Sequence, residues 1–157
     1  MIASRTIPGL VVALALATGA WAAEQAGGFV AVTPSELKWM DQPEIGPGAK
    51  MAVIEGNPMA AGPFTFQAKL PPHTKVAEHT HPLVEHVTVL SGTFYFATGD
   101  KFDKKKAKAY PPGSTLVIPK GTPMYAFTKD KAAVIQIHGV GPWGMDFVKP
   151  QPVAEKK

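Results

Sequence analysis

Apolar and polar residues alternate over short stretches of this chain, and proline or glycine separates one stretch from the next. A period of two residues is typical of a strand with one buried face, and almost no stretch keeps the 3.6-residue period of an amphipathic helix. The pattern predicts nine strands, at residues 50–55, 64–70, 75–81, 84–90, 93–97, 114–118, 124–127, 132–138 and 145–148. Short strands of this number and spacing predict an all-β sandwich or a small barrel.

The strands fall in a single predicted domain with an extension at each end. Residues 49–150 show no internal repeat and are predicted to form this domain, and residues 151–157 a flexible polar tail. Residues 23–48 are predicted to be an N-terminal arm. Within the arm, Thr33-Pro34-Ser35-Glu36 begins with an N-cap residue and leaves room for at most one helical turn.

The first 22 residues have the features of an export signal. Arg5 supplies a positive charge, residues 7–19 are apolar or small, and Ala20-Trp21-Ala22 fits a cleavage site before Ala23. The apolar stretch is shorter than the roughly 20 residues that span a bilayer, so no stable membrane anchor is expected. The mature chain is therefore predicted to be periplasmic or secreted.

The composition of the chain limits the kinds of site and partner that it can have. The chain has no cysteine, which excludes disulfides and metal sites built on thiolates. Its formal net charge is +4, and five lysines gather within residues 101–108, where Asp103 interrupts them. This cluster lies between two predicted strands and is interpreted as a solvated loop, so nucleic-acid binding has little support. The other interpretation is an attraction for anionic partners.

The densest chemical signal is the run His79-Thr80-His81-Pro82-Leu83-Val84-Glu85. The two histidines are two residues apart on a predicted strand, so both imidazoles leave the same face. Pro82 breaks the strand, and we expect a tight turn that brings Glu85 back over the histidines. Two imidazoles and one carboxylate suit divalent iron or manganese. The alternative is that these are polar residues on an exposed strand.

This run resembles the first motif of the cupin superfamily, which is His-x-His, three residues, Glu, six residues and Gly; here the glycine is Gly92. The second cupin motif matches at Gly113, Pro119 and Gly121, whereas Met124 and Thr128 replace its His and Asn. His73 stands where the first motif usually begins with glycine. The resemblance extends over residues 50–148 and implies a single-domain jelly-roll β-barrel with one divalent transition-metal ion, iron or manganese first and copper or zinc next.

A cupin of the usual type has a third histidine where this chain has Met124, so the fourth ligand is open. In one alternative Met124 only packs, and His79, His81 and Glu85 form a facial triad with open positions. In a second, His138 substitutes from a strand expected to form a hairpin with the strand that begins at Met124. In the third, Met124 is a ligand to copper. His73 and His86 are not expected to bind the metal.

Further residues are predicted to line the pocket: Phe66, Tyr125, Gln136 and Trp143, together with Met124. Trp143 lies in a glycine-rich segment, so its indole is a candidate cap for the barrel mouth. The resemblance implies either a metal-dependent enzyme on a small molecule, with dioxygenase, decarboxylase, isomerase and lyase chemistry all open, or a non-enzymatic binding or sensing module. It also implies a homodimer.

Overall fold

The computed structural model describes residues 28–150, which form eleven strands and no helix. The predicted signal peptide, residues 1–22, and the predicted tail, residues 151–157, lie outside the described residues. Within them, no helix is long and apolar enough to cross a membrane. The strands are β1 (Met40–Asp41), β2 (Lys50–Glu55), β3 (Gly62–Leu70), β4 (Lys75–Thr80), β5 (Glu85–Ser91), β6 (Phe94–Thr98), β7 (Lys108–Tyr110), β8 (Thr115–Ile118), β9 (Met124–Phe127), β10 (Ala133–Gly141) and β11 (Asp146–Phe147).

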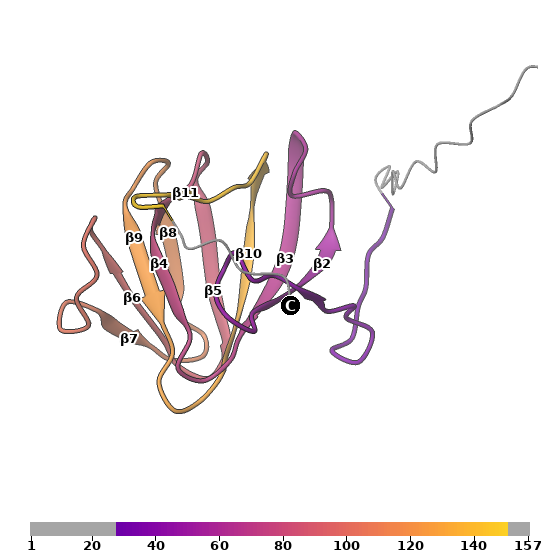
Figure 1. The fold of residues 1–157 in the computed structure, drawn as a ribbon. Coiled ribbons are helices and arrows are strands. Elements are labelled where there is room, and N and C mark those ends of the chain that lie inside the picture. Colours follow the sequence, from indigo (N-terminus) through magenta and orange to yellow (C-terminus); the bar gives the residue numbers. More distant parts are fainter. Residues whose placement is uncertain (1–27, 151–157) are drawn as a thin grey trace, which may run out of the picture.

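The strands form two antiparallel sheets that face each other (Figure 1). One sheet has six strands in the order β1-β2-β3-β10-β5-β8, and the other has five in the order β11-β4-β9-β6-β7. Apolar side chains fill the space between them. On β3, for example, Phe64, Phe66, Ala68 and Leu70 are all buried, as the period of two predicts.

Several neighbouring strands along the chain lie in different sheets. β4 belongs to the five-stranded sheet and β5 to the six-stranded sheet, so Pro82 begins a crossing between sheets and the expected hairpin is absent. The expected hairpin between residues 124–127 and 132–138 is also absent, because β9 and β10 lie in different sheets. β10 pairs with β3 and β5 instead. The absence of these two hairpins changes which strands surround the candidate site.

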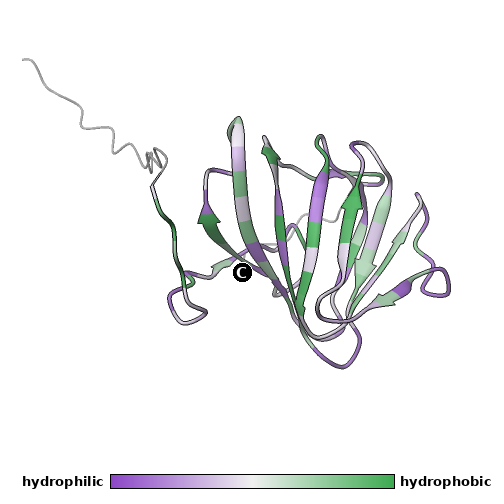
Figure 2. Cartoon of the chain, turned by 180° about the vertical axis from the view of Figure 1, so that it is seen from behind, coloured by the Kyte–Doolittle hydropathy of each residue, from purple (hydrophilic) through white to green (hydrophobic). Residues whose placement is uncertain are grey.

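All nine predicted strands are present, and two short strands were not predicted. β1 has two residues, and β7 begins at Lys108, the last lysine of the cluster, so its sequence lacks a clear apolar alternation. The loop between β6 and β7 is strongly hydrophilic (Figure 2), yet its Phe102 contacts two side chains of β9. Phe102 of this loop packs 5.0 Å from the ring of Tyr125 and 5.8 Å from that of Phe127. This cover explains why every residue of β9 is buried.

The described part of the arm begins with an exposed segment that leaves the body beside β2 (Figure 1). The single turn predicted at Thr33 is present: the backbone N–H and the hydroxyl of Thr33 both donate to Glu36 Oε2 at 2.7 Å. Phe29, Val30 and Val32 of this segment are exposed. The arm then turns inward at Ile45, which is buried in the core.

Candidate metal centre

The two histidines of the His-x-His run point into the space between the sheets, where each is only 4% exposed. His79 Nδ1 lies 2.6 Å from the carbonyl oxygen of Ala77, and His81 Nδ1 lies 2.6 Å from that of Gly144. A carbonyl oxygen only accepts, so each Nδ1 carries the proton and donates it. In the neutral imidazole the Nε2 atom then presents a lone pair.

The two Nε2 atoms face each other at 3.1 Å. Burial lowers the pKa of His79 to about 4, more than the hydrogen bond to Ala77 raises it, and the neighbouring charge of His81 lowers it further. His79 is therefore neutral at pH 7. Two opposed lone pairs at this distance repel each other unless a cation, either a proton or a metal ion, lies between them.

The third polar group of the centre is Glu85, the first residue of β5. Its Oε1 lies 3.4 Å from His81 Nε2 and accepts a hydrogen bond of 2.8 Å from Trp143 Nε1. Burial raises the pKa of Glu85, while the charge of His81 and the hydrogen bond from Trp143 oppose that rise. The carboxylate is thus held beside His81 by an indole that also stacks on the His81 ring at 5.4 Å.

A small cavity of about 40 Å³ adjoins these side chains. Its other walls are almost wholly apolar and come from both sheets and from the segments between strands that carry Ile45, Trp143 and Met145. The residues from the sheets are Ala68, Leu70, Val76, Val87, Phe94, Phe96, Ile118, Met124, Tyr125, Ala126, Ile135 and Ile137. The volume admits about two or three water molecules. An organic substrate needs more room than the cavity has in this conformation.

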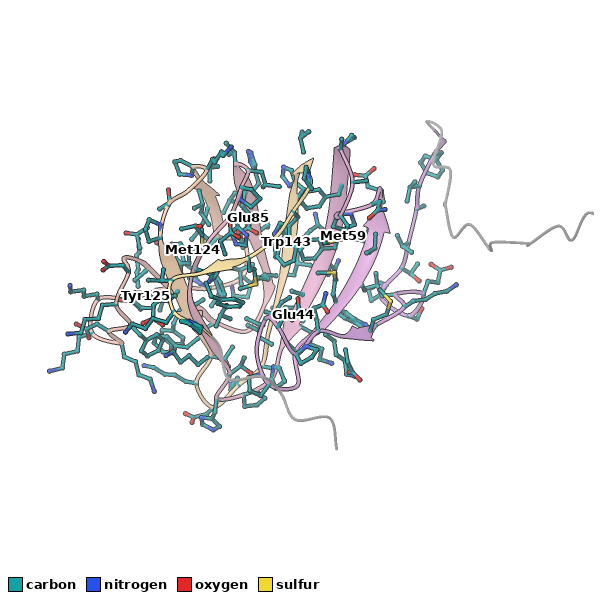
Figure 3. All side chains as sticks on the ribbon, turned by 45° about the horizontal axis from the view of Figure 1, so that its top comes forward. Glu44, Met59, Glu85, Met124, Tyr125 and Trp143 are labelled. Atoms are coloured by element: carbon teal, nitrogen blue, oxygen red, sulfur yellow. The ribbon has the colours of Figure 1, made fainter. Side chains whose placement is uncertain are left out.

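The three candidate ligands are neighbours but do not form a closed triad. His79 contacts His81 and His81 contacts Glu85, while Glu85 Oε1 is engaged by Trp143. Among residues 28–150, no group of three or more His, Asp or Glu side chains is arranged as a complete metal site. Figure 3 shows Glu85 and Trp143 close together in this region, with Met124 nearby.

Two predicted site residues lie elsewhere. His138 is exposed on the outer face of the six-stranded sheet, where its ring stacks on His86 at 4.6 Å. Gln136 shares that outer face, because the alternating Ile135 and Ile137 of β10 are the residues that line the cavity. The alternative in which His138 replaces the third histidine is therefore corrected: its strand lies in the sheet opposite β9, and its side chain points away from the candidate centre.

The other predicted pocket residues occupy different positions. Met124 lines the cavity and is in register with His79 on the neighbouring strand. Trp143 closes one side of the cavity, and Phe66 packs behind it at 5.1 Å from the indole without reaching the cavity. Tyr125 borders the cavity, but its hydroxyl donates to the carbonyl of Asp103 at 2.9 Å in the loop outside the sheet.

Sequence reasoning missed the backbone groups that orient the histidines. The carbonyl oxygens of Ala77 and Gly144 determine which nitrogen of each ring faces the cavity. Gly144 follows Trp143, so residues 143 and 144 together hold both Glu85 and His81. The glycine-rich composition of this segment indicated a tight loop. A hydrogen bond to a backbone carbonyl oxygen does not depend on the side chain, so the sequence does not reveal it.

Comparison with known families identifies the family of the fold. The profile of the ChrR cupin-like domain matches residues 28–115, which is more than half of the chain. The chain belongs to this cupin family. Comparison with curated protein sequences gives no significant match.

Solved structures support the same fold for this cupin. The polyketide cyclase RemF from Streptomyces resistomycificus superposes with a TM-score of 0.66 at 16% identity, over 79% of this chain and 88% of that chain. KdgF from a Halomonas species gives 0.55 at 18% identity, over 73% and 95%. A cupin-superfamily sugar phosphate isomerase from Silicibacter pomeroyi gives 0.54 at 14% identity, over 71% and 75%. The predicted all-β cupin jelly roll is confirmed.

Proposed function

We propose that this cupin binds one divalent transition-metal ion through Nε2 of His79, Nε2 of His81 and the carboxylate of Glu85. The observation that carries the proposal is the pair of opposed Nε2 atoms, 3.1 Å apart, on rings whose Nδ1 atoms are tied to carbonyl oxygens. Two ligands at about 2.1 Å from one ion and at right angles are about 3.0 Å apart. The spacing and the tautomers therefore suit shared coordination, once Glu85 turns its second oxygen toward the histidines.

The donor set favours iron or manganese, because a hard carboxylate stands beside two imidazoles. Zinc accepts the same donors, and copper is the alternative if the thioether of Met124 binds. When bound, the ion supplies Lewis-acid or oxygen-activating chemistry. The protein contributes the orientation of the two rings, a water-poor apolar cavity and the indole that holds the carboxylate.

The candidate function is metal-dependent chemistry or binding of a small molecule. Relatives of this fold include a polyketide cyclase and a sugar phosphate isomerase, which supports an enzyme acting on small molecules. The cavity of about 40 Å³ is smaller than an organic substrate needs, so its walls have to move before one can enter. Among the described residues, its walls offer no carboxylate or imidazole beyond the three proposed ligands, which favours the second candidate, a non-enzymatic metal or small-ligand binding or sensing module.

A cobalt titration tests the proposal and separates the candidates. Visible absorption of the Co²⁺-loaded protein reports the ligand number, and we expect a saturable spectrum at one ion per chain. A change on adding azide would show an open position that a small ligand can reach. Turnover of a screened substrate by the loaded protein but not by the apoprotein would favour the enzyme, and no Co²⁺ spectrum would contradict the proposal.

Met124→His provides a gain-of-function prediction. Met124 is in register with His79 and lines the cavity, so an imidazole there supplies the ligand that the second cupin motif usually carries. We expect the affinity for Mn²⁺ to rise on the order of tenfold or more, measured by isothermal titration calorimetry. The matched control is Met145→His, at a partly buried position on the loop side of the same cavity. An equal gain in both variants would contradict the predicted geometry.

Trp143→Phe tests the indole as the group that holds Glu85. Phenylalanine keeps an aromatic ring against His81 and Phe66 but cannot donate to Glu85 Oε1. We expect metal affinity to fall about 10- to 100-fold, as for other outer partners of metal ligands. Trp39→Phe, in the arm, should leave the affinity unchanged. An unchanged affinity in Trp143→Phe would show that the hydrogen bond does not position the carboxylate.

The proposal includes export and self-association. The apolar leader with its cleavage site before Ala23 supports a periplasmic or secreted protein, and the exposed Phe29, Val30 and Val32 of the arm support docking onto a second copy. Mass spectrometry of the protein from its native host should give a chain that starts at Ala23. Light scattering should give twice that mass, and the mass of a monomer would contradict the proposed homodimer.

A further inference from the structure

The outer face of the five-stranded sheet carries a groove that is separate from the metal centre. Part of it is a hollow of about 340 Å³ lined by His73, Thr74, Lys75, Phe102, Lys104, Phe127, Thr128, Lys129 and Asp130. A second hollow, of about 180 Å³, is lined by Thr93, Tyr95, Lys129, Asp130 and Lys131. The two share Lys129 and Asp130, so they adjoin; together they are called the lysine groove here.

The ammonium groups of the lysine groove lie on aromatic rings. Nζ of Lys104 is 5.5 Å from the centre of the Phe127 ring, and Nζ of Lys129 is 4.4 Å from that of Tyr95. Among the described residues, neither lysine makes an ion pair. Such contacts are worth only about 0.5–1 kcal/mol at exposed sites, so an arriving anion can draw both lysines away.

The charge of the groove is strongly unbalanced. Four lysines line it, at positions 75, 104, 129 and 131, against a single carboxylate, Asp130. Asp130 is exposed and lies 3.7 Å from His73 Nε2. Lys75 is the exception among the lysines, because it also approaches Glu78 at 3.6 Å. A concave surface with this excess of positive charge attracts anions.

The floor of the groove is aromatic. Tyr95 stacks on Phe127 with ring centres 5.0 Å apart, and Phe102 leans against Phe127 at 5.8 Å. Tyr95 and Phe102 are half-buried, and Lys129 and Lys75 lie over their faces. When Lys129 moves to an anion, it uncovers the face of the Tyr95 ring, on which a planar or ring-shaped group can pack, while Lys75, which approaches Glu78, stays over Phe102.

One end of the groove is shaped by an unusual backbone conformation. His73 has φ of 58°, a left-handed conformation that is uncommon for residues other than glycine. Its backbone N–H donates to the carbonyl of Lys129 at 2.8 Å, which ties the turn before β4 to the turn after β9. A strained residue held in this way is frequent at binding sites.

From these features we propose that the lysine groove binds a small organic phosphate, whose charged group contacts Lys104 and Lys129 and whose ring packs on Tyr95. The two adjoining hollows suit a small ligand better than a flat protein surface. The large exposed apolar side chains of the described residues lie outside the groove, which disfavours insertion into a membrane. The site is also independent of the metal centre, because Met124 and Ala126 line the cavity on the other face of β9.

Calorimetric titration of the full chain at low salt tests this proposal, with ADP as the probe and adenosine and inorganic phosphate as its separate parts. We expect ADP to bind with a Kd below about 1 mM and at least about tenfold more tightly than either part. The double variant Lys104→Ala, Lys129→Ala should lose at least about tenfold in affinity. Lys104→Arg, Lys129→Arg should retain binding. The matched control is Lys38→Ala, Lys120→Ala, which removes the same charge from exposed positions outside the groove.

Several results would overturn the proposal. Equal weakening in the groove variant and in the control would show that ADP responds only to net charge. If inorganic phosphate binds as tightly as ADP, the aromatic rings do not contribute to recognition of the ligand. No ADP binding, together with binding to phosphatidylglycerol vesicles that the groove variant loses, would assign the surface to a membrane instead. Thermal unfolding of each variant verifies that these exposed substitutions leave the fold intact.

Discussion

His81→Ala is expected to weaken Mn²⁺ or Fe²⁺ binding on the order of a thousandfold or more, a larger loss than the 10- to 100-fold typical of an outer partner. The substitution removes the central member of the contact series, since His81 Nε2 lies 3.1 Å from His79 Nε2 and 3.4 Å from Glu85 Oε1. Calorimetric titration of the apoprotein measures the loss. His79→Ala should behave in the same way.

Three controls accompany this prediction. His86→Ala removes a histidine from the outer face of the six-stranded sheet and should leave the affinity unchanged, and His138→Ala should do the same. Met124→Ala should change the affinity by no more than a few fold, because a thioether is a weak ligand for these ions. A loss in His86→Ala or His138→Ala as large as that in His81→Ala would place the metal on the outer face and contradict the account.

The second large effect concerns stability. Gly92 joins β5 to β6 with φ of 73°, and a Cβ atom there would lie 2.0 Å from the carbonyl oxygen of Ala132 and 2.9 Å from Cα of Ala133. Gly92→Ala adds left-handed strain of about 1–2 kcal/mol to this backbone clash. We expect the free energy of unfolding to fall by about 3 kcal/mol and the melting temperature by more than about 10 °C in a thermal scan.

Gly113→Ala is the matched control for this substitution. Gly113 also has a left-handed φ, of 86°, but no atom lies within 4 Å of a Cβ built there. Its alanine variant carries the strain without the clash, so we expect a loss of only about 1–2 kcal/mol. Equal melting temperatures for the two variants would show that the turn at Gly92 relaxes and that the close approach to Ala132 is not needed.

The period of two residues was enough to predict nine of the eleven strands, because each sheet buries one face against the other. It could not predict which strands pair. The strand of residues 132–138 was expected beside Met124, but β10 pairs with β3 and β5 in the opposite sheet. For the same reason His138 was one of the alternatives for the fourth ligand, while the structure turns it outward and directs Ile135 and Ile137 into the cavity.

The candidate ligands were easier to predict than their surroundings. His79 and His81 share a face because they are two residues apart on one strand, and Glu85 stays close because only three residues separate it from His81. The tautomers depend on carbonyl oxygens of Ala77 and Gly144, which side-chain patterns do not reveal. The lysine cluster was interpreted as a solvated loop. The loop is held against β9 by Phe102, whose contacts with Tyr125 and Phe127 join residues far apart in the sequence and could not be predicted.

We propose that His79, His81 and Glu85 hold one metal ion between the sheets. Metal analysis by inductively coupled plasma mass spectrometry tests it most directly, on protein purified through its native export route without chelator. About one iron or manganese per chain is expected in the wild type and in His138→Ala, and almost none in His79→Ala. No metal in the wild type, even after incubation with Fe²⁺, Mn²⁺, Zn²⁺ or Cu²⁺, or full occupancy in His79→Ala, would contradict the claim.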